Sequence, residues 1–190
     1  MKTLHLHFLF IAPLLVFIAC APDNEGLNTI DVPNPIPNAI YYNYNILYND
    51  SGLTQVKMTG KILEQYGGDK ENHAFDNMKD SVHLWFYDEN MIVQSELLAD
   101  RATRDRATGF MEAFDNVIVY NEKGEKLETD HLIWNEKEER ISTEDSVTIT
   151  KKGQIIKGKG LVSDKNFINY EIKNVSGVIN VKKENEQTDQ

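Results

Sequence analysis

Three aspartates recur at matching positions and could supply carboxylate chemistry. Asp100, Asp130 and Asp164 each follow a small residue, in the pairs Ala-Asp, Thr-Asp and Ser-Asp. Carboxylates brought together could hold a cation or act as general acid and base. The alternative is structural, because an Asp after a small residue caps or turns the backbone through its side chain. We favour the structural interpretation, since one such pair occurs in each of three similar segments.

The histidines and the cysteine form no recognisable catalytic motif. The histidines after residue 20 are His73, His83 and His131, and none has metal-ligand spacing to another His or Cys. His83 alternates out of step with Val82 and Leu84, which predicts that it faces solvent. The sequence contains no G-x-S-x-G nucleophile motif. We therefore predict no enzyme activity, no metal and no cofactor.

The only cysteine, Cys20, ends an apolar run at the N-terminus. This run, from Phe8 to Ala19 behind Lys2, has 12 residues, whereas a bilayer-spanning helix needs about 20. The layout is typical of a cleaved signal peptide. Phe17-Ile18-Ala19-Cys20 resembles a bacterial lipobox, in which the signal is cut before Cys and the thiol carries a diacylglycerol. The alternative is an ordinary signal peptide with an incidental cysteine.

Composition and charge limit the kinds of partner that the protein can bind. Hydrophobic residues make up 41% and charged residues 26% of the chain, as in ordinary globular proteins. The formal net charge of -10 disfavours binding to nucleic acid and charge-driven adhesion to an anionic membrane. Attachment to a membrane would therefore depend on the lipid at Cys20.

The chain divides into four predicted parts. Four of the five prolines lie shortly after Cys20, and proline disfavours both helices and inner strands. We predict a signal peptide over 1–19, a lipidated Cys and Pro-rich tether over 20–40, a folded domain over 41–183 and a polar tail over 184–190.

The folded part shows the pattern of β-strands. Apolar residues alternate in DSVHLWFY, DNVIVYN and DSVTITK, which indicates half-buried strands. Turn residues separate such runs at 66–69, 88–90, 121–124 and 151–153. ADRATRDRAT, over 99–108, has helix-forming residues but no apolar stripe, so we predict strand and turn there.

Similar segments repeat at intervals of 28 to 35 residues. Their aligned valines are Val82, Val117, Val147 and Val175. Units of about two strands cannot bury an apolar face alone, so they must stack. This predicts an all-β fold of two facing antiparallel sheets, or of one sheet folded over, built from stacked strand repeats.

Alternation also predicts which side chains line the interior. These candidate lipid-facing positions are Val82, Leu84, Phe86, Val117, Val119, Leu132, Trp134, Val147, Ile149, Ile172 and Val175. The alternative for each is ordinary sheet core, and the sequence does not separate the two. Gly158, Gly160 and Gly177 lie in or beside strand patterns, which predicts bulges or close backbone approach.

Several segments in order resemble the LptC family of the lipopolysaccharide exporter. They are YNDSGLTQVKMTG, VHLWFYDENMIVQSELLADRA, DNVIVYNEKGEKLETDHLIWN and IIKGKGLVSDKNFINYEIKNVSGVI, and the resemblance covers roughly Tyr41 to Val181. It is to the lipoprotein form of Bacteroidetes-type bacteria, because Cys20 stands where other members have a transmembrane helix. The family's fold is a β-jellyroll of two antiparallel sheets, shared with LptA and OstA-like domains.

The resemblance implies a role in lipopolysaccharide transport. Such a protein is periplasmic, anchored here by lipid to the inner membrane, and receives lipopolysaccharide from the membrane subunits of an ABC transporter. It passes the lipid, held in an apolar groove, to an LptA-like jellyroll that leads to the outer membrane. Two other interpretations stay open: a structural surface lipoprotein, and an outer-membrane assembly factor that binds peptides.

Overall fold

The computed structural model of the protein describes residues 36–50, 52–68 and 73–180. The predicted signal peptide, Cys20, most of the predicted tether and the tail over 184–190 lie outside these residues. Within the described part every regular element is a β-strand. That part contains no helix long and apolar enough to cross a membrane.

Ten strands are present in the described residues. They are β1 (Ala39–Asp50), β2 (Leu53–Tyr66), β3 (Phe75–Tyr87), β4 (Val93–Ala99), β5 (Arg101–Asp105), β6 (Phe110–Asn121), β7 (Lys126–Asn135), β8 (Arg140–Lys151), β9 (Gln154–Asp164) and β10 (Tyr170–Asn180). The first strand thus begins two residues inside the segment predicted as tether. The segment 99–108 is strand and turn as predicted, because β4 ends at Ala99, β5 follows and a turn covers 106–108.

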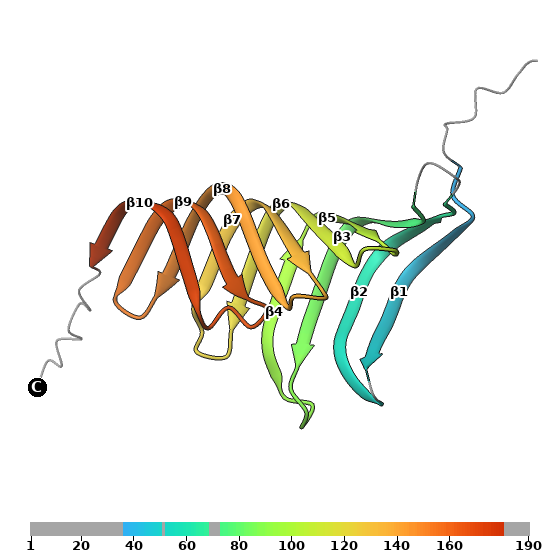
Figure 1. The fold of residues 1–190 in the computed structure, drawn as a ribbon, viewed down its shortest axis with the longest axis horizontal. Helices are drawn as coiled ribbons and strands as arrows, with labels where there is room; N and C mark the ends of the chain where they lie inside the picture. The colour runs from blue at the N-terminus through green and yellow to red at the C-terminus, as the bar shows by residue number, and fades with distance from the viewer. Residues whose placement is uncertain (1–35, 51, 69–72, 181–190) are drawn as a thin grey trace, which may run out of the picture. The chain divides into compact units, whose positions relative to one another are not determined.

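All ten strands belong to one antiparallel sheet whose order follows the sequence, from β1 to β10 (Figure 1). β4 and β5 share one position, since both pair with β3 on one side and β6 on the other. The all-β prediction is confirmed, and of its two forms the structure has the single sheet folded over. Strands that are not paired meet across the fold, as where the Phe86 ring on β3 packs edge-on against Trp134 on β7, with ring centroids 5.1 Å apart.

The sheet folds where its strands bend near their middles. In β3 the bend lies at Asp80 and Ser81, with φ of 57° and 87°, and in β6 at Asp115 and Asn116, with φ of 62° and 52°. The pairing register shifts at these bends in both strands. Extra residues that interrupt the ladder kink a strand and increase its twist. Each bent strand therefore contributes one half to each layer of the fold.

The bends explain the repeats seen in the sequence. Three of the aligned valines end an Asp-Ser-Val or Asp-Asn-Val tripeptide, and these tripeptides lie at the bends of β3 (80–82), β6 (115–117) and β8 (145–147). The Ala-Asp pair at 99–100 separates β4 from β5, and the Thr-Asp pair at 129–130 lies at the register shift of β7. A repeat thus runs from bend to bend, across one hairpin, rather than comprising two whole strands. The third small-Asp pair departs from this pattern, because it ends β9.

Hairpin turns form where Asp or Asn side chains accept backbone N–H groups. Asp88 Oδ1 accepts from the N–H of Asn90 at 2.9 Å, and Asn121 Oδ1 from that of Lys123 at 3.0 Å. This is the Asx-turn geometry that favours these residues in loops. The predicted turns at 88–90, 121–124 and 151–153 are confirmed. The one at 66–69 lies in the β2–β3 connection, and Asp69 is outside the described residues.

Candidate functional site

The inner face of the folded sheet is a continuous apolar core. Nine of the eleven residues predicted to face the interior are buried in it: Val82, Leu84, Phe86, Val117, Val119, Leu132, Trp134, Val147 and Ile149. Ile172, on β10, is partly buried against this core. Val175 is not in it, since 57% of its surface is exposed on the edge strand β10, beside a register shift. Alternation therefore located the interior, except where the pattern reaches the sheet edge.

Two cavities adjoin this core beside β1 and β2. The first has a volume of about 230 Å³, and its apolar lining is Ile46, Tyr48, Val56, Met58, Leu63, Met78 and Trp134. The second, of about 220 Å³, shares Tyr48, Val56, Trp134 and Glu136 with the first. Ile46 and Tyr48 are 38% and 42% exposed. The apolar interior therefore reaches the molecular surface at this place.

Charged side chains complete the wall of the larger cavity. Arg104 Nη2 lies 2.9 Å from Glu136 Oε2, and Arg106 Nε lies 3.1 Å from Asp76 Oδ1. Burial raises the pKa of Asp76 above its ordinary value, although Arg106 and Arg104 act in the opposite direction. Both arginines are thus paired within the protein, and the uncharged lining beside them is apolar or aromatic apart from Gln65.

Tyr48 stands between the two cavities and is held by charged neighbours. Its hydrogen bond to Glu136 raises the pKa of the Tyr48 phenol. The Arg104 guanidinium lies over the Tyr48 ring, 5.6 Å from its centroid. These contacts join β1 to the turn after β7, although β1 pairs only with β2 in the described sheet. The position of the Tyr48 side chain is therefore determined by Glu136 and Arg104 across the fold, in addition to the pairing of β1 with β2.

Trp134 belongs to the lining of both cavities, and its indole contains a buried donor that has no acceptor among the described residues. Trp134 is 6% exposed, and its Nε1 has no hydrogen-bond partner among the described residues. Buried polar atoms are nearly always paired, so such a group calls for an explanation. Tyr44 Oη and Asn166 Oδ1 are also buried without a partner there, but neither residue lines either cavity. Burial raises the pKa of Tyr44.

Next to the cavities the β9–β10 loop fills the interior with one side chain. Phe167 is fully buried, with a left-handed φ of 52°, and its ring stacks on Tyr170 at 4.9 Å. The Asn121 amide donates to the Phe167 carbonyl at 2.8 Å. Ser95 Oγ donates to the Lys165 carbonyl at 2.9 Å. Side chains distant in sequence thus hold this loop inside the fold.

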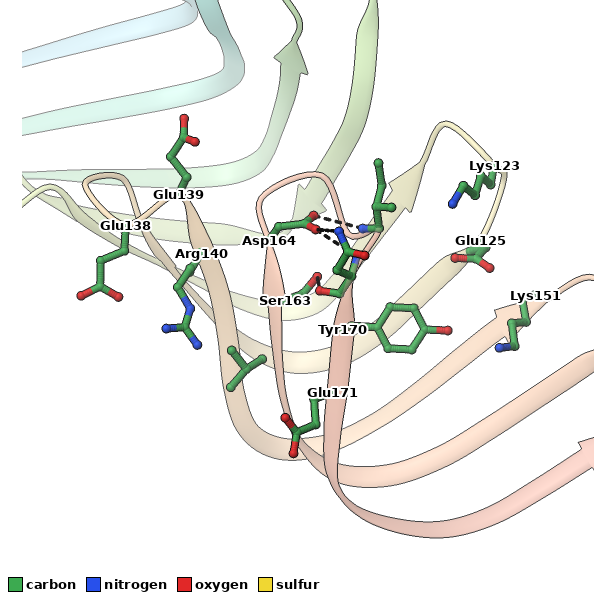
Figure 2. Close-up of a pocket in the computed structure, with 13 residues that line it drawn as sticks. Lys123, Glu125, Glu138, Glu139, Arg140, Lys151, Ser163, Asp164, Tyr170 and Glu171 are labelled. Atoms are coloured by element: carbon green, nitrogen blue, oxygen red, sulfur yellow. Dashed lines mark hydrogen bonds between the residues drawn. The ribbon is translucent and has the colours of Figure 1, made fainter.

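Outside this loop lies a wide polar hollow of about 1080 Å³, drawn in Figure 2. Its lining carries both signs of charge, including Lys123, Glu125, Arg140 and Glu171. Figure 2 shows these side chains spread along the hollow, not directed at one point. Such a lining lacks the few convergent polar groups that a small-molecule site needs.

The three candidate aspartates do not share a site. Asp164 accepts hydrogen bonds from the backbone N–H groups of Asn166, Ile168 and Asn169, and so forms the β9–β10 turn. Asp100 accepts from the Asn116 amide at 2.7 Å. Asp130 lines a separate hollow at the bend of β7. These bonds support the structural interpretation of Asp100 and Asp164.

The histidines lie apart from one another, each beside one carboxylate. His73, His83 and His131 lie 2.9 Å from oxygens of Asp105, Glu96 and Glu112. The described residues contain no group of three His, Cys, Asp or Glu side chains that could hold a metal ion. The His83 side chain is 25% exposed and stacks on Trp85, so its predicted solvent-facing position is only partly open to water.

The three predicted glycines differ in their surroundings. A Cβ on Gly158 would meet Ile172 Cγ2 and would lie 2.7 Å from the Asn174 carbonyl oxygen. Gly160 has a φ of 75°, a left-handed conformation that favours glycine. A Cβ on Gly177 would meet no atom within 4 Å, and Gly177 lies at the register shift of β10, as its predicted bulge requires. Close packing therefore explains the glycine at 158, and the left-handed backbone conformation explains the glycine at 160.

Sequence reasoning missed Phe167, Tyr48 and Arg104. Phe167 lies in a turn, where no alternation marks a buried side chain. Tyr48 belongs to β1, whose burial pattern is almost wholly exposed. Arg104 lies in the RATRD segment of β5, and nothing in that segment shows that it reaches Glu136. In each case the missing information was a contact between distant parts of the chain.

The ten antiparallel strands and their apolar interior are those of a β-jellyroll. A family model described as "Lipopolysaccharide-assembly, LptC-related" matches residues 28–180. The chain therefore belongs to the LptC family. A comparison with curated proteins finds no match. Membership implies a role in lipopolysaccharide transport with the Lpt machinery, at a periplasmic location associated with the inner membrane. It is a transport family rather than a known enzyme family.

Proposed function

We propose that this protein receives lipopolysaccharide from the membrane subunits of the export ABC transporter and passes it to an LptA-like jellyroll. The observation that carries the proposal is the apolar cavity between β1, β2 and Trp134, which connects the buried inner face with the surface. Acyl chains leave water with a gain of about 25 cal/mol per Å² of buried apolar area. This attraction is non-directional, so a chain can slide along such a wall.

Lipid entry would then proceed from the cavity into the core. The inner-face residues are packed against one another, with Leu84 and Ile149 fully buried. Acyl chains would reach them when the two layers separate along the strand bends. In this proposal the candidate lipid-facing residues form the sheet core while the layers are closed, and they line the lipid groove when the layers open. The two interpretations from the sequence, core and groove lining, then describe two states of the same residues.

The edge strands are the proposed docking surfaces for the neighbouring components. β1 and β10 each have one partner strand in the described sheet, so their outer edges carry unpaired N–H and C=O groups. Another jellyroll can add a strand to such an edge. Val178 and Ile179 on β10 are each 52% exposed and would give a docked strand apolar contact.

Site-specific photocrosslinking of the full chain in cells tests lipid capture. A photoreactive residue at Met58, which lines the cavity, or at Val119 should crosslink to lipopolysaccharide only when the transporter can hydrolyse ATP. The matched controls are the next position, Thr59, and the preceding one, Ile118, because successive side chains of a strand face opposite sides. Equal crosslinking at both members of each pair, or none in a folded protein, contradicts the proposal.

The proposed anchor is the acyl group on Cys20, which lies outside the described residues. Cys20→Ala should move the protein from the membrane fraction to the soluble periplasmic fraction, since the apolar run before it is shorter than a bilayer span. The measurement is fractionation followed by a high-salt wash. A variant that still sediments with membranes after the wash would show that the anchor lies elsewhere.

A further inference from the structure

The β9–β10 loop, over 165–169, puts a large side chain between the two layers of the folded sheet. Phe167 is fully buried, and its ring stacks on Tyr170 with the centroids 4.9 Å apart. Among the described residues, Phe167 is the one fully buried apolar side chain that no strand supplies. The alternation that fills the rest of the core therefore does not account for it.

Hydrogen bonds hold this loop to both layers at the strand ends, opposite the bends. In one layer, where β4 pairs with β6, the Asn121 amide donates to the Phe167 carbonyl at 2.8 Å and Ser95 Oγ donates to the Lys165 carbonyl at 2.9 Å. In the other layer, the Lys165 N–H donates to the Glu139 carbonyl at 2.9 Å. In the strand order, β4 and β6 lie between β2 and β8 to β10. The loop therefore crosses the interior between the cavities beside β2 and the edge strand β10.

Two features of the loop in this position are unfavourable. Phe167 has a φ of 52°, a left-handed conformation that bulky residues rarely adopt. Asn166 Oδ1 is buried and has no hydrogen-bond partner among the described residues. Such strained or unpaired groups persist only where surrounding contacts outweigh them. Both are relieved when the loop moves out into water, so the burial of Phe167 and the bonds from Ser95 and Asn121 hold the loop in against them.

Space for such a movement lies on the outer side of the loop. The polar hollow of about 1080 Å³ has Ile168, Asn169 and Tyr170 in its lining. The Asp164 carboxylate accepts from the N–H groups of Ile168 and Asn169 (Figure 2). These bonds keep the loop compact, so it can turn as a unit about its two ends. The loop thus has an apolar interior on one side and an open hollow on the other.

We infer that the β9–β10 loop is a gate in the path of the transported lipid. With the loop in the observed position, Phe167 closes the interior between β2 and β10. When the loop turns outward into the hollow, the interior becomes continuous between these strands. The inference rests on the proposed function and deepens it, because lipid received beside β2 has to pass this loop before it reaches the β10 edge, one of the two proposed docking edges.

Photocrosslinking of the full chain, in cells with an active transporter, tests the gate. A photoreactive residue at Met58 reports lipid on the β2 side of the loop. One at Ile156, which packs against the core from β9, reports lipid beyond the loop. The measured quantity is the ratio of lipopolysaccharide crosslinking at Ile156 to that at Met58. This ratio corrects for the amount of lipid that each variant receives.

Three variants should move this ratio in opposite directions. Ser95→Ala removes a bond that closes the loop and should raise the ratio about fivefold, the factor that one neutral hydrogen bond supplies. Phe167→Leu shortens the blocking side chain, keeps it apolar and should also raise the ratio. Asn166→Ala removes the unpaired acceptor, stabilises the closed loop and should lower the ratio about fivefold.

Each variant has a matched control at an exposed position. Ser146→Ala lies at the bend of β8, Asn90→Ala in the β3–β4 turn, and Phe110→Leu at the start of β6. Each should change the ratio less than about twofold. Melting temperatures show which variants are folded. A loop with only a structural role would change the melting temperature and leave the ratio unchanged.

The outcomes separate the gate from the proposed function. If the wild-type chain crosslinks at both positions and all three variants keep its ratio, the gate is wrong and the proposed function stands. A ratio that falls in Ser95→Ala or rises in Asn166→Ala also contradicts the gate. If lipid reaches Met58 but reaches Ile156 in neither the wild type nor Ser95→Ala, the gate is wrong and only the receipt of lipid stands. If the wild-type chain crosslinks at neither position, the proposed function fails and the gate fails with it.

Discussion

Two adjoining regions of the interior are built differently. Around Phe167 the chain fills its own space, and the Asn121 and Ser95 side chains pair with backbone carbonyls of the loop. Around Trp134 the chain leaves about 230 Å³ of apolar space and an indole N–H without an acceptor among the described residues. The first region is filled by the protein's own side chains. The second is left open by the protein's own side chains, so changes there should cost less stability than changes at Phe167.

The largest expected loss of stability follows from a change at Phe167, in the filled region. Phe167→Ala removes a fully buried ring that stacks on Tyr170 and should lower the free energy of unfolding by about 3–5 kcal/mol. Urea denaturation followed by circular dichroism measures it. Phe110→Ala, at a residue that is 43% exposed, should cost less than about 1 kcal/mol. Similar losses for the two variants would remove the contrast between a filled region and an unfilled one.

The next largest loss of stability is expected when the Asn121 side chain, which holds the β9–β10 loop, is removed. Asn121 is 6% exposed and accepts from Lys123 and Glu125 while donating to Glu125 and the Phe167 carbonyl. Asn121→Ala leaves those groups without partners and should cost about 2–3 kcal/mol. The same denaturation experiment measures it. A loss below that of the exposed Phe110→Ala variant would mean that the loop is held in another way.

A pH titration sharpens the comparison at the same loop. Burial alone would raise the pKa of Asp164, but hydrogen bonds from the N–H groups of Ile168 and Asn169 outweigh it and hold the pKa below the ordinary 3.8. Because the folded pKa is depressed, the stabilisation is fully present above pH 3.8 and is lost as the pH falls through the folded pKa.

Asp164→Asn should therefore cost about 1–2 kcal/mol at pH 7 and make stability less dependent on pH below 4. Denaturation curves at pH 7, 4 and 2.5 measure both quantities. The control is Asp130→Asn, whose carboxylate does not line this turn. Wild type and Asp164→Asn curves that stay parallel through acid would contradict the assignment.

The smallest effect on stability belongs to the Trp134 side. Glu136→Gln weakens a pair with Arg104 whose side chains are 19% and 21% exposed, and should cost less than about 1 kcal/mol. It should nevertheless loosen Tyr48 and increase acrylamide quenching of Trp134, measured in a Trp85→Phe background. Glu128→Gln, which affects the Lys126 pair, is the matched control and should leave the quenching unchanged. Equal quenching in the two variants would show that the position of Tyr48 does not control the access of acrylamide to Trp134.

Local patterns were sufficient to predict the strands and most turns. Alternation around Val82, Val117 and Val147 gave both the strand class and the buried face, because period-two patterning is a property of neighbouring residues. Asp88 and Asn121 marked turns through hydrogen bonds within a few residues. These features need no knowledge of the rest of the chain.

The bends and the cavity were not predictable in the same way. The motif at 80–82 looks like the start of a strand but lies inside one, where Asp80 and Ser81 have positive φ values and the pairing register with β2 shifts. Trp134 was assigned correctly to the interior, yet its missing acceptor depends on what β1 and β2 leave open beside it. Cavities are properties of the whole packing.

The strand order also bears on how the chain folds. Each strand pairs with its predecessor in the sequence, apart from the shared position of β4 and β5. Most connections close only a few residues, so little loop entropy opposes each step. Folding rate rises as contacts become more local, and we expect this domain to fold faster than a Greek-key sandwich of equal size. The sheet can grow by adding one strand at a time to an existing edge. In the docking proposed above, a neighbouring chain would continue the same growth at β1 or β10.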